Sequence, residues 1–179
     1  MQNIFLKTKR LDLRYITQDD FLELKTILQD KDVMYAWEYD FTDTDVQEWV
    51  DKTLEHYNKY NLGFFIMSEN KSGNVIGQAA LMPDIIENKQ YYEISYILKK
   101  EYWHKGYAIE VAKALKEYAF YTLKLKEVIF EIRPSNIPSR KVAENLNAEI
   151  CGEFMKNVRN IKMKHLIYKI SIETNNTME

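Results

Sequence analysis

The most informative stretch of this sequence is Tyr102-Trp103-His104-Lys105-Gly106-Tyr107-Ala108-Ile109-Glu110-Val111-Ala112. It lies where an apolar strand pattern ends and a long helical pattern begins. The first turn of a helix leaves backbone N–H groups without intrahelical partners, and the aligned peptide dipoles add positive potential there. Because Gly106 lets the backbone approach a ligand closely, the stretch suits a phosphate or pyrophosphate. One glycine at a helix start is also typical of simple capping, so this pattern alone leaves both interpretations open.

Hydrophobic spacing on both sides of this stretch predicts the other elements. Alternating or short apolar runs predict strands at residues 11–15, 63–67, 75–82, 91–98, 128–132, 148–154 and 165–172. Apolar residues three and four apart predict helices at residues 18–28, 43–58, 105–123 and 138–146. Turn-forming residues at 70–74 predict a hairpin, and Asn147 suits a left-handed position after the last helix.

This order of elements predicts an α/β (α+β) fold with one mixed central sheet of about six to seven strands, flanked by about four helices. The chain has 179 residues and shows no internal repeat or linker that would divide it. We therefore expect a single domain over residues 1–173, followed by a frayed tail at residues 174–179.

Charge and composition exclude several classes of protein. A formal net charge of -2 gives no long-range attraction for phosphate backbones, so nucleic acid is not expected as a partner. The single cysteine, Cys151, cannot form an internal disulfide and is read as a buried small hydrophobic residue in a reducing compartment. No signal peptide or apolar stretch of about 20 residues is present, so we expect a cytoplasmic protein without membrane contact.

Five segments stand in an order and spacing that point to one family. They are Thr8 to Arg14 (T-K-R-L-D-L-R), Val75-Ile76-Gly77, Glu93 to Tyr96 (E-I-S-Y), Trp103 to Ala108 (W-H-K-G-Y-A) and Asn136 to Leu146. Together they resemble the GNAT acetyltransferase superfamily, and within it the group containing ribosomal-protein alanine and serine N-acetyltransferases. The resemblance runs over nearly the whole chain and implies a GNAT-like domain that uses acetyl-CoA as co-substrate.

The resemblance also implies where acetyl-CoA binds. The family pattern Gln/Arg-x-x-Gly-x-Gly/Ala stands at residues 103–108, with Trp103 departing from the superfamily consensus at the first position. The pyrophosphate is expected on backbone groups of His104, Lys105, Gly106, Tyr107, Ala108 and Ile109, with Lys105 adding a mobile charge whose alternative is surface solvation.

The pantetheine arm has two further expected contacts. The preceding strand is expected to splay from its neighbour at Tyr96, Ile97 and Leu98, which frees backbone groups to pair with the amide arm; the alternative is an ordinary sheet ladder. Asn136 and Ser139 match the family's Asn-x-x-Ser, in which the Asn contacts the arm and the Ser lies near the sulfur. As bare residues, both are also good helix starters.

Catalysis requires a base, because a primary amine with a pKa of about 10 is mostly protonated at neutral pH. Glu93 is the candidate, acting through water, and its tyrosine neighbours Tyr91, Tyr92 and Tyr96 are expected to raise its pKa by desolvation. An exposed strand glutamate is the alternative. No tyrosine stands between Asn136 and Leu146, so Ser139 is expected to hydrogen-bond the departing thiolate while solvent delivers the proton.

The acceptor amine is expected to enter past the aromatic loop that carries Tyr35 and Trp37, where Glu38 could attract a cation; aromatic core packing is the alternative. The acceptor is a protein N-terminus or a small molecule, and the sequence does not choose between them. Scattered histidines and one cysteine predict no metal site. Either a monomer or a homodimer, through the last strands, is compatible with the sequence.

Two other readings stay open at this stage. A coenzyme A-binding sensor without catalytic activity would share the fold, and the missing tyrosine motivates that reading. A phosphoryl-transfer domain would also use a helix N-terminus, but it needs Gly-x-x-x-x-Gly-Lys-Ser/Thr and a carboxylate for Mg²⁺, and the glycine pattern is missing.

Overall fold

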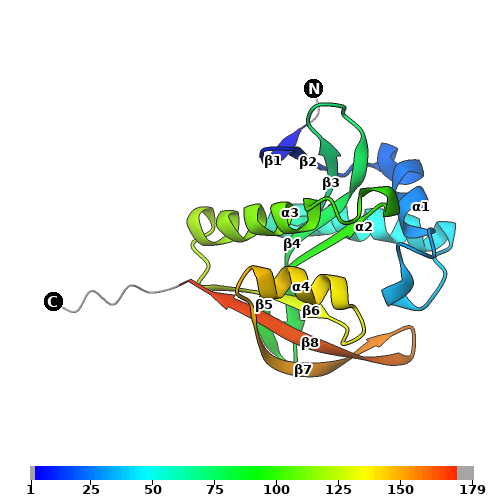
Figure 1. The fold of residues 1–179 in the computed structure, drawn as a ribbon. Helices are drawn as coiled ribbons and strands as arrows, with labels where there is room; N and C mark the ends of the chain where they lie inside the picture. The colour runs from blue at the N-terminus through cyan, green and yellow to red at the C-terminus, as the bar shows by residue number, and fades with distance from the viewer. Residues whose placement is uncertain (1–2, 173–179) are drawn as a thin grey trace.

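The computed structural model describes residues 3–172, and in this range eight strands form one sheet in the order β1-β2-β3-β4-β5-β6-β8-β7 (Figure 1). The strands are β1 (Ile4–Lys7), β2 (Leu11–Tyr15), β3 (Gly63–Glu69), β4 (Val75–Ile86), β5 (Lys89–Leu98), β6 (Glu127–Ile132), β7 (Glu149–Val158) and β8 (Ile161–Ser171). The helices are α1 (Phe21–Leu28), α2 (Asp43–Tyr60), α3 (Tyr107–Glu117) and α4 (Ile137–Asn145). Among the described strands only β5 and β6 pair in parallel, so the predicted mixed α/β sheet is confirmed.

The sheet has one strand more than predicted. The prediction missed β1, whose apolar residues do not alternate with polar ones. This strand is held by pairing with β2 and by Phe5, whose ring stacks on Phe65 with centroids 3.9 Å apart. The four predicted helices and the 70–74 hairpin are present, and Asn147 is left-handed at φ 63°. The predicted tail at 174–179 lies outside the described residues.

The last two strands are longer than their sequence pattern suggested. They meet at Arg159 and Asn160, which both have positive φ, 50° and 66°. Two consecutive left-handed residues form the tight turn that suits the twist of a β-hairpin. The hairpin therefore extends β7 to Val158 and starts β8 at Ile161, well beyond the predicted ends.

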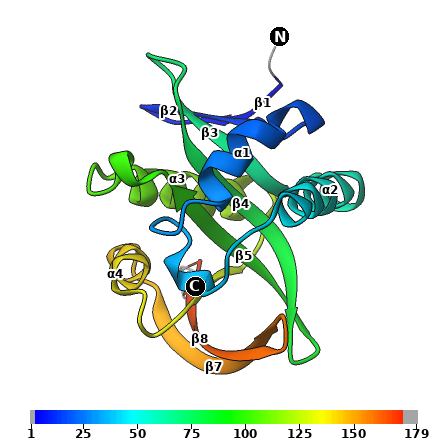
Figure 2. The same ribbon diagram turned by 90° about the vertical axis from the view of Figure 1, so that its right-hand side faces the viewer.

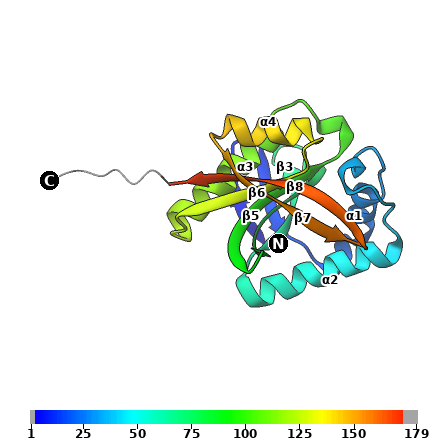
Figure 3. The same ribbon diagram turned by 90° about the horizontal axis from the view of Figure 1, so that it is seen from below.

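Helices cover both faces of the sheet, and each face has its own core (Figure 3). Ile66 of β3 packs with apolar residues of α1 and α2, whereas its neighbours Phe65 and Met67 pack with those of α3 and α4. This alternation is what a strand buried on both faces produces. Among the described residues, no helix is both long and apolar enough to cross a membrane.

The sheet opens in its middle, between β5 and β6. β5 pairs with β4 from Ile86↔Lys89 through to Gly77↔Leu98, but its ladder with β6 contains a single pair, Glu93↔Ile129. Beyond Glu93 the β6 side of β5 therefore has no strand partner in the described structure. Figure 2 shows β7 and β8 curving away beneath the β4–β5 pair.

Candidate active site

The start of α3 is built to present bare backbone N–H groups. Gly106 is the N-cap residue with φ 77°, and no side chain caps the helix. His104, two residues earlier, also has a positive φ of 59°. Left-handed residues at this spacing turn successive N–H groups toward one side, and the uncapped first turn adds its own donors. The geometry suits an anion.

Arg10 braces this loop from the far end of the chain. Its Nε forms an ion pair with Glu110 Oε2 at 2.5 Å, and its Nη1 donates to the Lys105 carbonyl at 2.9 Å. The guanidinium also lies over the Tyr107 ring, 4.3 Å from the centroid. Although burial opposes it, hydrogen bonds from Thr8 and Arg10 hold the pKa of Glu110 below its ordinary value. The two family segments at residues 8–14 and 103–108 thus form one structural unit.

A cavity of about 830 Å³ runs from this helix start along the open edge of β5. Its lining includes ten of the eleven residues predicted to bind the coenzyme: Tyr96, Ile97, Leu98, His104, Gly106, Tyr107, Ala108, Ile109, Asn136 and Ser139. It also includes Tyr35 and Trp37, which were predicted to bind the acceptor. Lys105 is not among the lining residues. Its Nζ lies 5.1 Å from the centre of the ring of Tyr102, which does line the cavity.

A second cavity of about 340 Å³ lies on the other side of the same strand. Aromatic and methionine side chains form its walls: Trp37, Trp49, Phe64, Met82, Phe130 and Met163. The two cavities share six lining residues, namely Ala36, Trp37, Tyr96, Ile97, Asn136 and Ser139. They therefore adjoin one another at the point where β5 has lost its partner strand.

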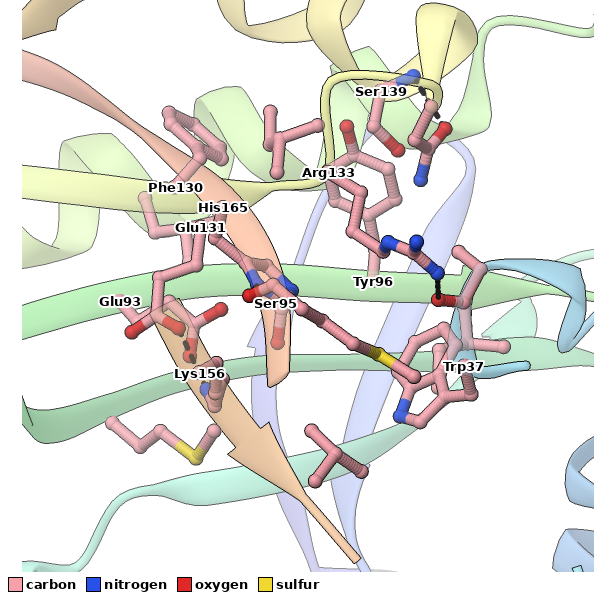
Figure 4. Close-up of a pocket in the computed structure, with 18 of the residues that line it drawn as sticks. Trp37, Glu93, Ser95, Tyr96, Phe130, Glu131, Arg133, Ser139, Lys156 and His165 are labelled. Atoms are coloured by element: carbon pink, nitrogen blue, oxygen red, sulfur yellow. Dashed lines mark hydrogen bonds and ion pairs between the residues drawn. The ribbon is translucent and has the colours of Figure 1, made fainter. Parts of the chain in front are cut away.

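Polar groups at this junction are linked. Asn136 Oδ1 accepts a hydrogen bond from the Ser139 backbone N–H at 3.3 Å and from the Tyr35 hydroxyl at 2.8 Å. Burial raises the pKa of Tyr96 above its ordinary range, and the nearby Ser139 hydroxyl acts in the opposite direction. Ser139 is thus positioned at the start of α4, between the two cavities (Figure 4).

Glu93 lies at the far end of the smaller cavity and is 6% exposed, which excludes the alternative of an exposed strand glutamate. Burial raises its pKa to about 7; Lys156 acts to lower it and Asp84 to raise it. The predicted source of this burial needs correction for two of the three tyrosines. Tyr92 and Tyr96 pack against the core that contains α3 and α4, whereas Tyr91 packs against the cluster that contains Ile129, the strand partner of Glu93.

Three residues that the sequence analysis missed surround Glu93. The carboxylates of Asp84, Glu93 and Glu131 come within 4.8 Å of one another. Lys156 Nζ lies 2.6 Å from Glu131 Oε2 and 3.5 Å from Asp84 Oδ2. Among residues 3–172, no other group of three acidic, histidine or cysteine side chains lies this close together. The positive charge beside these three carboxyl groups comes from Lys156. Glu131 could have been found, because the predicted strand 128–132 places it on the face opposite Phe130; Lys156 gave no signal.

The expected role of Glu38 is also changed. Its carboxylate pairs with Arg133 Nη1 at 2.7 Å, and it lines neither cavity. Arg133 Nη1 also donates to the Ala36 carbonyl at 2.9 Å, so it anchors the 35–37 turn. Glu38 is therefore not a free carboxylate for a cationic acceptor, and the acidic groups that line the smaller cavity are Glu93 and Glu131.

Comparison with known proteins agrees with this geometry. A family model described as an acetyltransferase (GNAT) domain matches residues 10–149. YnaD of Bacillus subtilis (strain 168), which is named as an N-acetyltransferase, is 30% identical over 152 residues, or 84% of this chain and 86% of YnaD. A GNAT-family acetyltransferase structure from Bacillus anthracis has a TM-score of 0.77 and 27% identity, covering 94% of this chain and 98% of its own. Ribosomal-protein-S5-alanine acetyltransferase from Vibrio fischeri shares the fold, with a TM-score of 0.73 and 18% identity over 97% and 98% of the two chains.

The site combines an uncapped helix start, an open strand edge beside it and two adjoining cavities. The chain belongs to the GNAT acetyltransferase family and is an acyltransferase. Membership implies acetyl-CoA as the co-substrate, and the residues present fit that molecule: the helix start suits its pyrophosphate, and the larger cavity follows the strand edge toward the junction.

Proposed function

We propose that this enzyme moves an acetyl group from acetyl-CoA to a primary amine, either a protein N-terminus or a small molecule, by direct attack. The observation that carries the proposal is the junction of two cavities at Tyr96, Asn136 and Ser139. When bound in the larger cavity, acetyl-CoA supplies an activated thioester. An amine in the smaller cavity can then meet it without a covalent intermediate on the enzyme.

The donor side is held mainly by backbone groups. We infer that N–H groups from His104 to Ile109 bind the pyrophosphate, and that the open edge of β5 at Tyr96, Ile97 and Leu98 pairs with the amide arm. Asn136 is expected to contact the arm as well. Because backbone donors are fixed before the substrate arrives, they stabilise charge on the thioester oxygen at little reorganisation cost.

Glu93 is the proposed base, and its environment supports this role. A carboxyl group whose pKa is about 7 is ionised in part of the molecules at neutral pH and holds a proton well once it receives one. It lies toward the opposite end of the cavity from Ser139, so a water molecule is expected to carry the proton from the amine (Figure 4). Ser139 then hydrogen-bonds the developing thiolate, and solvent protonates it.

The lining of the smaller cavity favours an amine acceptor that binds as a cation and loses its proton afterwards. Aromatic walls that include Trp37 and Trp49 favour a cation, and Glu93 and Glu131 lie at the far end. Tyr35 lines the larger cavity only, where its hydroxyl donates a hydrogen bond to Asn136 Oδ1. The Vibrio fischeri neighbour is named for an alanine of ribosomal protein S5. We include a protein N-terminus in this class of acceptors.

A coenzyme A-binding sensor is the second candidate, and one observation favours it: α4 carries no tyrosine to protonate the thiolate. Thiol release from acetyl-CoA with a panel of amines and N-terminal peptides, alongside calorimetric titration with coenzyme A, separates the two. Turnover with one class of amine supports the enzyme. Tight binding without any turnover favours the sensor, and no binding contradicts the assigned coenzyme cavity.

A further inference from the structure

The side chain of Lys156 starts on an edge strand and contacts acidic side chains that belong to strands in the middle of the sheet. It lies on β7, which is the last strand in the order β4-β5-β6-β8-β7, whereas Asp84 lies on β4 and Glu93 on β5. A flat sheet would keep these strands about 14–19 Å apart, since neighbouring strands are about 4.8 Å from one another. The curl of β7 and β8 beneath β4 and β5 instead brings Lys156 Nζ to 3.5 Å from Asp84 (Figure 2).

The cluster contains more acid than base. Charged and titratable groups come to this region from five strands and the segment after β6. Tyr96, Glu131, Arg133, Lys156 and His165 line the smaller cavity, and Asp84 lies in the cluster beside Glu93. Arg133 is already paired with Glu38, and burial lowers the pKa of His165, so neither adds a free cation at neutral pH. Lys156 is the remaining positive charge among these residues.

The contact with Glu131 does not neutralise the positive charge of Lys156. Its side chain is 2% exposed, and its Oε1 is buried without a hydrogen-bond partner in the described structure. Burial, followed by the charge of Glu93, raises the pKa of Glu131, so the neutral form of Glu131 is favoured. Although burial opposes it, Glu131 and Lys156 hold the pKa of Asp84 below its ordinary value, so Asp84 is ionised. Lys156 and Asp84 therefore act on Glu93 with opposite signs.

We propose that Lys156 is a positioning residue for the reaction: its ammonium, reaching in from β7, balances the charge of Asp84 and favours the charged form of Glu93. This inference rests on the proposed function, in which Glu93 takes the amine proton. Lys156 itself touches Glu131 and Asp84 and does not need to touch substrate. Its side chain is 39% exposed, so the cluster also keeps a route by which solvent can remove the proton.

The test compares the pH dependence of kcat/KM in Lys156→Gln and Asp84→Asn. Loss of the cation should move the acidic limb to higher pH by about one unit, which is a roughly tenfold loss of rate below the limb. Loss of the Asp84 charge should move the same limb to lower pH. Lys156→Arg should restore the limb. Lys164→Gln is the matched control, because Lys164 pairs with Glu153 on the same hairpin and lies outside both cavities.

A second measurement does not depend on turnover. The ¹³C carboxyl resonance of Glu93, assigned with Glu93→Gln, is titrated in the same variants, and its midpoint should move up in Lys156→Gln and down in Asp84→Asn. Midpoints that stay in place, or move in the same direction in both variants, overturn the proposal. Shifted midpoints in a protein that acetylates no amine would instead support the cluster and contradict the proposed function.

Discussion

Arg10 and Glu110 are separated by 100 residues in the sequence and joined by an ion pair of 2.5 Å. This pair ties the loop between β1 and β2 to the first turn of α3. Since Arg10 also donates to the Lys105 carbonyl at 2.9 Å, it fixes the backbone that is proposed to hold the pyrophosphate. The relationship gives the first prediction.

Arg10→Ala should weaken acetyl-CoA binding by roughly 5- to 30-fold, because it removes about 1–2 kcal/mol of charged hydrogen bonding that orders the loop. Arg10→Lys should recover little of this, since an ammonium lacks the planar fork that bonds both partners. Calorimetry with coenzyme A measures the change. Lys7→Ala is the control, because Lys7 makes an exposed pair with Asp12 on the neighbouring strands. If Arg10→Ala binds coenzyme A with unchanged affinity, the contacts of Arg10 with Glu110 and Lys105 do not contribute to the coenzyme site.

Gly106 offers a sharper test of the anion site. Gly106→Glu should abolish coenzyme binding, with at least about a 100-fold loss, because it places a negative side chain at the helix start. Gly106→Ala adds a side chain without a charge, so it shows how much of the effect of Gly106→Glu is caused by backbone strain. Its added Cβ would lie 3.5 Å from Arg10 Nη2, an ordinary contact, but φ 77° is unfavourable for alanine.

Gly73→Ala is the matched control for that strain, since Gly73 has φ 74° and open space around it. Urea unfolding should show the same loss of stability, about 1 kcal/mol, in both alanine variants. Only Gly106→Ala should also weaken coenzyme A binding. Equal coenzyme affinities in wild type and Gly106→Glu would contradict the assigned site.

Glu93→Gln should lower kcat by about 100-fold or more and remove the acidic limb near pH 7, because activity rises as Glu93 loses its proton. An acceptor analogue with a low amine pKa should lose less, since it is already neutral before it attacks. The acidic limb is read from kcat/KM against pH. A variant with an unchanged rate and profile would eliminate Glu93 as the base.

The same substitution should increase stability at alkaline pH. The pKa of Glu93 is raised from 4.5 to about 7 in the folded protein, so the folded state binds more protons than the unfolded state between these values. Stability contributed by the protonated form is therefore lost as pH rises through that window. The advantage of Glu93→Gln in unfolding free energy should grow by about 2 kcal/mol from pH 5 to pH 8. Urea titrations at both values measure it.

Gly77 allows β4 to approach β5 beside the coenzyme cavity. A Cβ there would lie 2.1 Å from the Ile97 carbonyl oxygen, so Gly77→Ala must push the end of β5 aside. We expect a loss of about 1–3 kcal/mol in stability together with a higher KM for acetyl-CoA. Gly152→Ala is the control strand glycine, because its Cβ would meet only Ile167 at 3.7 Å. Equal effects at both glycines would argue against a special role for this contact.

Local patterns predicted the parts of this protein that local chemistry determines. Alternation identified seven of the strands, and helical spacing identified the four helices. The family segments placed Gly106, Asn136 and Ser139 near one another, and the larger cavity brings them together. β1 was missed because its burial depends on the Phe5–Phe65 stack, which joins residues distant in sequence.

What could not be predicted depends on how the sheet bends. Lys156 reaches Asp84 and Glu131 only because β7 and β8 curl across the sheet, and no pattern in residues 148–172 indicates that curl. The pairing of Glu38 with Arg133 is similar, since it depends on how the 35–37 turn docks beside the end of β6. Charge partners that come from separate strands and loops require the three-dimensional arrangement.

Because β5 and β6 are joined by a single bridge, two cavities lie beside β5, and different parts of the chain line them. Residues that line only the larger cavity come mainly from the segment 98–109 and from α4, while those that line only the smaller one come mainly from β5, β6 and the last hairpin. If the smaller cavity holds the acceptor as proposed, we expect substitutions in that hairpin to alter the choice of acceptor and leave donor affinity intact. The architecture lets the two specificities diverge separately, which suits a scaffold reused for many amines.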